Sequence, residues 1–150
     1  MEKSERPAIP VVFEREIALK VSIDELEKLL DWMACIFEDY SCPGKICNQL
    51  AVITEEIFVN IARYAYDTKD GNALIRVGRA GSALVMQFVD TGKHFNPLEK
   101  IDPDIGAPIE NRSIGGLGIY ITKKWMDSIQ YDRVNDENRL TLYKSIAAQT

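Results

Sequence analysis

The order of apolar and polar residues along the chain predicts a series of strands and helices. Residues 11–20 are rich in apolar and β-branched side chains, which is typical of a strand. Ser22 and Glu25 have the spacing of a capping box, and behind them apolar residues recur at steps of three and four, as on the buried face of a helix. That helix ends near Tyr40, and its buried face consists of Leu26, Leu29, Leu30, Met33, Ile36 and Phe37.

A second helix is predicted to end near Tyr66, after a break at Pro43 and Gly44. Its inner stripe consists of Ile46, Leu50, Ile53, Ile57, Ile61 and Tyr64. Residues 73–79 and 83–90 then read as two strands joined by a short turn that contains glycine, which is the pattern of a hairpin.

The segment 91–113 shows little periodicity and contains three prolines. An irregular loop of this length in a compact domain is usually functional, and we interpret it as a lid. A third helix is predicted over residues 117–126, followed by strands over 128–134 and 139–147. The chain therefore mixes three helices with five strands.

Composition favours a single domain over residues 1–150, because 46% of the residues are apolar and the length allows a sizeable core without staples. The 18 basic and 23 acidic residues give a net charge of −5, so there is no strong electrostatic case for nucleic acid or an anionic membrane as the main partner, although a locally basic face stays open. No run has the length of a signal sequence core or a membrane span, and we expect a cytoplasmic protein.

Cysteine and histidine are too few for a zinc cluster. Cys35, Cys42 and Cys47 form no CxxC pair, and His94 is the only histidine. We expect the three thiols to be reduced and to serve packing.

Two polar residues on the second predicted helix have a spacing that suits chemistry. Glu56 and Asn60 are four residues apart, so their Cβ atoms lie roughly 6 Å apart on one face. A carboxamide can hold a metal ion and a carboxylate can act as a base. The same spacing is also typical of a solvated polar edge, while the adjacent Glu55 points about 100° away.

Asp90 ends an apolar strand and is followed by Thr91 and Gly92. A carboxylate in this place can accept a hydrogen bond from the exocyclic amine of a purine. Aspartates at strand ends also commonly cap turns.

Three glycines, Gly115, Gly116 and Gly118, stand where the lid becomes a helix. Free amides and the positive end of the helix would both point at an anion there. The chain has neither a GxxxxGK[ST] phosphate loop nor the dinucleotide fingerprint, so any nucleotide site belongs to another class.

A family resemblance lies in four segments: EEIFVNIARYAY, DTGKHFNP, IGGLGIYITKKWMDSIQY and NRLTLYKSI. Together they resemble the anti-sigma factor serine/threonine kinases of bacterial partner switching, within the GHKL ATP-binding superfamily. The resemblance covers nearly the whole chain. It implies an α/β two-layer sandwich, the Bergerat ATP-binding fold, with a mixed, mostly antiparallel sheet covered on one face by helices.

The resemblance also implies roles for single residues. Asn60 would coordinate the Mg²⁺ of bound ATP, Glu56 would be the general base, and Asp90 would bind the adenine amine. Arg112 is interpreted as a phosphate contact from the lid, although an exposed arginine is more often solvated. The remaining expected nucleotide contacts are Gly92, Gly115, Gly116, Gly118 and Thr141, the last beside the adenine.

The implied function is that of an ATP-dependent protein serine kinase. Its expected partners are an anti-sigma-factor antagonist of the STAS type, which it would phosphorylate, and a sigma factor, which it would bind; a homodimer is plausible. Two alternatives stay open, a nucleotide-gated binding switch without phosphotransfer and a simple ATPase.

Overall fold

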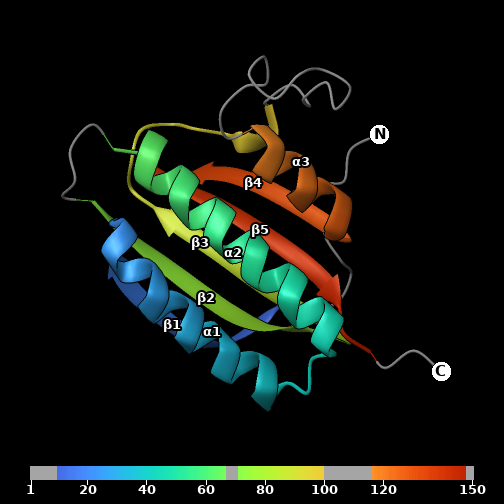
Figure 1. Cartoon of the computed structure of the whole chain (residues 1–150). Coiled ribbons are helices and arrows are strands. Elements are labelled where there is room, and N and C mark those ends of the chain that lie inside the picture. The colour runs from blue at the N-terminus through green and yellow to red at the C-terminus, as the bar shows by residue number, and fades with distance from the viewer. Residues whose placement is uncertain (1–9, 67–70, 100–115, 148–150) are drawn as a thin grey trace, which may run out of the picture.

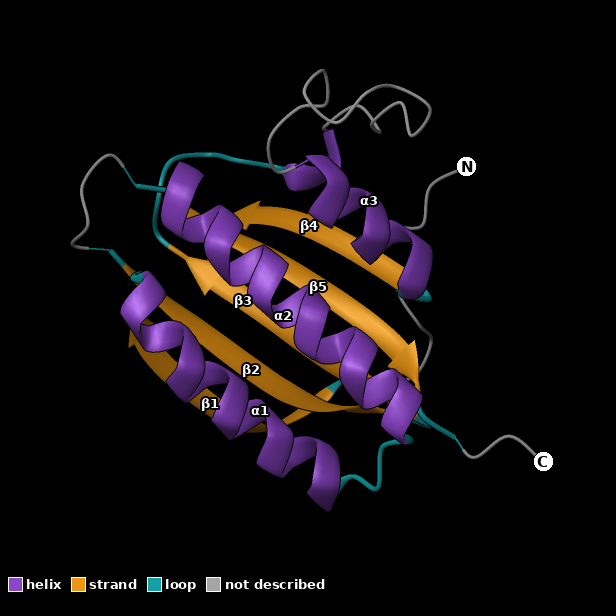
Figure 2. Ribbon diagram, viewed as in Figure 1, coloured by secondary structure: helices purple, strands orange, loops and turns teal. Residues whose placement is uncertain are grey.

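The computed structural model describes residues 10–66, 71–99 and 116–147. Within them, five strands form one sheet and three helices cover one of its faces (Figure 1, Figure 2). The elements are β1 Val12–Lys20, η1 Ile23–Glu25, α1 Leu26–Asp39, α2 Gly44–Tyr64, β2 Asn72–Ala80, β3 Ala83–Asp90, η2 Pro97–Glu99, α3 Gly116–Trp125, β4 Ser128–Val134 and β5 Glu137–Ser145. The expected two-layer α/β fold is confirmed.

The strands follow the order β1-β2-β3-β5-β4 across the sheet, and each pairing between these described strands is antiparallel. The sheet is therefore more uniform than the mixed sheet that the resemblance implied. The turn between β4 and β5 has positive φ at both Asn135 and Asp136, the conformation that matches the twist of a hairpin. In the central pairing, Asp90 lies opposite Asn138.

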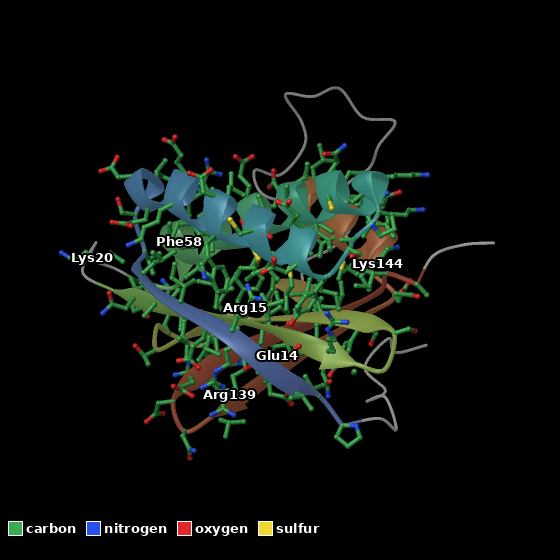
Figure 3. The ribbon with its side chains drawn as sticks, turned by 90° about the horizontal axis from the view of Figure 1, so that it is seen from below. Glu14, Arg15, Lys20, Phe58, Arg139 and Lys144 are labelled. Carbon is green, nitrogen blue, oxygen red and sulfur yellow. The ribbon has the colours of Figure 1, made fainter. Side chains whose placement is uncertain are left out.

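The core lies between the helices and the sheet. In Figure 3, Phe58 on α2 lies between these two layers, and it is fully buried. Four of the six positions predicted for the first helix, namely Leu29, Met33, Ile36 and Phe37, are buried, while Leu26 and Leu30 are only partly buried. Burying each such side chain contributes about 1.5–3 kcal/mol. The apolar stripes therefore fix which face of each helix meets the sheet.

The other face of the sheet is not covered by these helices, and Arg139 lies on it in Figure 3. Side chains of a strand alternate between the two faces. On β5, Leu140 and Leu142 join the main core, whereas Tyr143 packs with Val85 in a separate small cluster. This alternation decides which side chains of β5 reach the pocket described below.

The three cysteine thiols differ in how far they are buried. Cys42 and Cys47 pack at the edge of the core, whereas Cys35 is exposed on α1, which corrects the expectation that all three thiols serve packing.

Across the described ranges, no helix combines the length and apolar character needed to cross a membrane.

Candidate functional site

One pocket brings together three segments that are distant in the sequence. Asn60 comes from α2, Asp90 from the end of β3 and Ile119 from α3. The rest of the lining is mostly apolar and consists of Ile57, Ile61, Phe88, Phe95, Pro97, Tyr131, Asn138 and Leu140. An apolar pocket with a few polar groups is the usual form of a small-molecule site.

Asn60 is buried in this pocket with an unpaired polar atom. Its side chain is 4% exposed, and Nδ2 has no hydrogen-bond partner in the described part of the chain. A buried polar group without a partner costs about 1–3 kcal/mol, and most such groups in native proteins are satisfied. The side chain is therefore suited to a bound group that supplies the missing contact.

Glu56 lies one helical turn before Asn60 and reaches the first turn of α3. A Cβ atom at Gly118 would overlap Oε2 of Glu56, so the carboxylate lies directly against the backbone of that glycine. Glu55 is exposed, whereas Glu56 is half-buried, in keeping with their different directions around α2. A carboxylate near a helix N-terminus is also favoured by the helix dipole.

Asp90 is buried at the end of β3, and its carboxylate is held by two hydrogen bonds. Oδ1 accepts from the backbone N–H of Gly92 at 2.9 Å and from Nδ2 of Asn138 at 2.9 Å. Burial raises the pKa of the Asp90 carboxyl, and the bonds from Asn138 and Gly92 and the charge of Arg133 oppose that rise. The carboxylate is thus costly to bury but well placed to accept a donor from a ligand.

Gly92 is required by a close backbone approach. A Cβ atom there would overlap the backbone carbonyl of Ala65, the C-cap residue that follows α2. The same carbonyl accepts the N–H of Lys93 at 2.8 Å, and the carbonyl of Gly92 accepts from Nη1 of Arg133 at 2.7 Å. The turn after β3 is therefore fixed against both α2 and β4.

Thr141 does not line this pocket, which corrects its expected place beside the adenine. It accepts a hydrogen bond from Nε2 of Gln87 at 3.2 Å and lines a groove on the other face of the sheet, together with Arg139 and Tyr143. The residue of β5 beside Asp90 is Asn138, three positions earlier, and an odd separation along a strand reverses the face. The register of β3 against β5 identifies Asn138, whereas the sequence pattern alone does not.

The structure describes some of the other expected glycine and arginine positions but not all of them. Gly116 begins α3, so it lies at the helix start that the sequence predicts. Arg112 and Gly115 lie outside the described residues.

The pocket is narrow in this structure. The space between its side chains is about 30 Å³, enough for a water molecule but about a tenth of a typical ligand site. Phe95 forms part of the wall of the pocket, and the centroid of its ring lies 5.4 Å from that of the Tyr64 ring. A nucleotide base therefore needs side chains of the wall to move before it can enter.

Comparison with known proteins defines the class to which this architecture belongs. Residues 19–144 match the family described as the histidine kinase-like ATPase domain, an ATP-binding domain of the GHKL type. The chain belongs to this family.

The similar proteins include proteins named as kinases, and the fold is also similar to that of solved structures. The chain is 31% identical over 99 residues to "Serine-protein kinase RsbW" of Bacillus thuringiensis (strain Al Hakam) and of Bacillus anthracis (strain A0248). These matches cover 63% of this chain but only 61% of the length of each relative. The fold is similar to that in the crystal structure of the RsbU and RsbW domains of Rv1364c from Mycobacterium tuberculosis, with a TM-score of 0.64 and 9% identity over 91% of this chain and 34% of that one.

Proposed function

We propose that the chain is a cytoplasmic, ATP-dependent protein serine kinase that phosphorylates an anti-sigma-factor antagonist of the STAS type and binds a sigma factor. The family and the similarity to proteins named serine-protein kinase RsbW support this proposal. The observation that carries it is the position of the Glu56 carboxylate against Gly118, one helical turn from the unpaired amide of Asn60.

The side chains present fit a magnesium nucleotide. Mg²⁺ in proteins usually takes one or two side-chain oxygens and completes its shell with water and substrate phosphates. Asn60 is buried and faces the pocket, and its side-chain oxygen is the atom that would hold the ion, while its unpaired Nδ2 is a donor that could bond a phosphate oxygen or a water molecule. When bound, the ion would neutralise charge on the phosphates.

The proposed transfer needs a general base for the serine hydroxyl and a side chain that recognises the adenine. Glu56 would take the proton of the substrate serine hydroxyl while the serine oxygen forms its bond to the γ-phosphorus and ADP leaves. Asp90 would accept the exocyclic amine of the adenine. Glu56, on α2, lies against Gly118 in the first turn of α3, and Asp90, at the end of β3, lines the pocket together with Ile119 of the same helix, so the nucleotide would lie between the two carboxylates.

The narrow pocket supports a second candidate, a nucleotide-gated binding switch. Entry of a base must displace wall residues such as Phe95 and Pro97, and such a change of shape can alter the affinity for a protein partner without phosphotransfer. The two functions differ in whether the partner gains phosphate.

Transfer of radiolabelled phosphate from ATP to a STAS-type antagonist tests the proposal. Glu56→Gln should retain ATP binding and lose transfer, because the amide cannot accept the proton. Glu55→Gln is the matched control, since it removes the adjacent exposed carboxylate, and it should transfer normally. Normal transfer by Glu56→Gln would remove Glu56 from the base role. Partner release by a non-hydrolysable analogue without transfer would favour the switch, and phosphate release without a partner would favour a simple ATPase.

A further inference from the structure

We propose that Asn138 is a positioning residue that makes the pocket select a purine with an amine at position 6 over one with a carbonyl there. This inference rests on the nucleotide binding proposed above and extends it to a residue of β5 that touches Asp90.

Asn138 is held at both ends of its amide. Nδ2 donates to Oδ1 of Asp90 at 2.9 Å and to the carbonyl of Lys93 at 2.8 Å. Oδ1 accepts the backbone N–H of Phe95 at 3.3 Å and the hydroxyl of Tyr131. Turning the amide over would bring its oxygen against two acceptors and its N–H groups against the N–H of Phe95, so these contacts fix one orientation.

The fixed amide determines what Asp90 can offer to a ligand. Within the described residues, the Asp90 carboxylate accepts one hydrogen bond from the backbone N–H of Gly92 and one from Nδ2 of Asn138. Both bonds go to Oδ1. Oδ2 is therefore the oxygen left for a ligand in the pocket. Because two donors hold Oδ1 as an acceptor, the carboxylate cannot easily rotate or carry a proton on that side.

A carboxylate held in this way discriminates between purines. It accepts a hydrogen bond from a 6-amino group, whereas a 6-carbonyl group would place two acceptors against each other in a buried site. Sites that use a buried polar group in this way reject the mismatched analogue strongly, because the buried group is left unpaired. Without the Asn138 amide, Asp90 is free to rotate or to take up a proton and donate to the carbonyl.

The same amide also supports the wall of the pocket. Its bonds to Lys93 and Phe95 tie β5 to the segment that follows β3, and Phe95 lines the pocket. One side chain therefore sets both the base-reading carboxylate and the wall beside it.

Binding of ATP and of inosine triphosphate, which carries a carbonyl at position 6, tests the proposal. Titration calorimetry, with competition against a fluorescent nucleotide for weak ligands, gives the two affinities in the presence of Mg²⁺. The wild-type chain should prefer ATP by at least about tenfold. Asn138→Ala should weaken ATP roughly 10- to 100-fold and weaken inosine triphosphate by a much smaller factor, because only ATP loses the contact that reads its amine, so the preference collapses.

Gln87→Ala is the matched control, because Gln87 is a hydrogen-bonded amide of the central strand β3 on the other face of the sheet. It should leave both affinities unchanged. Tyr131→Phe is the second variant and decides the matter if Asn138→Ala does not fold, as judged by circular dichroism. It removes a donor to Oδ1 of Asn138 and should reduce the preference by a smaller factor.

The outcomes separate this inference from the proposed function. If the wild-type chain binds ATP but the preference is absent, or persists in the variants, the role of Asn138 is overturned and ATP binding stands. If the folded wild-type chain binds neither nucleotide, both proposals fall.

Discussion

The carboxylate of Glu56 on α2 lies so close to the backbone of Gly118 on α3 that no side chain fits between them. The two helices are adjacent in the layer that covers the sheet (Figure 1). The sequence pattern suggests that the glycine lets backbone amides approach phosphate. The structure adds a second physical reason, because Gly118 must also leave room for Glu56.

Gly118→Ala should therefore displace Glu56 and lower phosphotransfer. A methyl group at this position cannot coexist with Oε2 in its present place, and a shift of about 1 Å in a catalytic group can reduce a rate about 100-fold. We expect transfer to the antagonist to fall at least tenfold while the chain keeps its circular dichroism spectrum.

Gly44→Ala is the control for Gly118→Ala. Gly44 is the first residue of α2, and a Cβ atom there has no neighbour within 4 Å. This variant should keep full transfer and gain about 0.4–1 kcal/mol in unfolding free energy, because alanine restricts the unfolded chain. Full transfer by Gly118→Ala as well would show that the position of Glu56 is not critical.

Asp90→Asn should abolish ATP binding and change the pH dependence of stability. Burial raises the pKa of Asp90 above its ordinary value of 3.8, so between the two values the folded chain binds more protons than the unfolded chain. Stability therefore falls as pH rises through that window and stays reduced above it. The asparagine variant has no carboxyl to ionise, so its stability does not fall in this pH window. Its amide would place an N–H group against the adenine amine, and two donors cannot form a hydrogen bond with each other.

Urea denaturation between pH 3.5 and 7 and calorimetry with ATP measure both effects of Asp90→Asn. The difference in unfolding free energy between variant and wild type should increase in favour of the variant as pH rises. A difference that does not vary with pH, or ATP binding at wild-type strength, would contradict the assignment of Asp90 as a buried, base-reading carboxylate.

Local patterns in the sequence predict most of the elements, because the spacing of apolar residues reports directly which face of a helix or strand is buried. The predicted first strand and the described β1, for example, share the end Lys20. The same reasoning also identifies Glu56 and Asn60 as a pair, because residues four positions apart on a helix lie on the same face.

The position of Thr141 shows what the local pattern does not contain. Both Asn138 and Thr141 are buried polar residues of the last strand, and alternation places them on opposite faces, but which residue of this strand lies opposite Asp90 depends on the register with β3. That register is set by contacts between segments far apart in the sequence, so it follows from the folded structure alone. The wall formed by Phe95 and Pro97 is equally inaccessible, because the segment after β3 has no periodicity.

Asn60→Leu should stabilise the chain in the absence of ligand and remove its response to magnesium ATP. The substitution replaces a buried amide whose Nδ2 has no partner in the described part of the chain with an apolar side chain of similar size, which should raise the unfolding free energy by about 1–3 kcal/mol. Thermal unfolding with and without the nucleotide measures both effects, since a ligand that binds only the folded state raises the midpoint.

Thr54→Val is the control for Asn60→Leu. Thr54 is buried on the same helix, but its hydroxyl donates to the carbonyl of Leu50 at 2.7 Å, so its substitution removes a satisfied bond. This variant should gain little or no stability and should keep the ligand response. A less stable Asn60→Leu variant that still responds to magnesium ATP would show that Asn60 serves packing alone.

Phe95→Ala should speed nucleotide association. The space in the pocket is about 30 Å³, so ATP must wait for the wall to open, and association that requires a conformational change is slow. In stopped-flow measurements with a fluorescent ATP analogue, the observed rate of the wild-type chain should level off as the nucleotide concentration rises, because opening becomes limiting. Phe95→Ala widens the pocket and should restore a linear dependence, with a rate roughly tenfold higher at high nucleotide concentration. Phe13→Ala removes an aromatic ring from the groove on the other face of the sheet and should behave as the wild type. A linear dependence in the wild-type chain would mean that the wall opens faster than the nucleotide arrives, and the narrow pocket would then not limit binding.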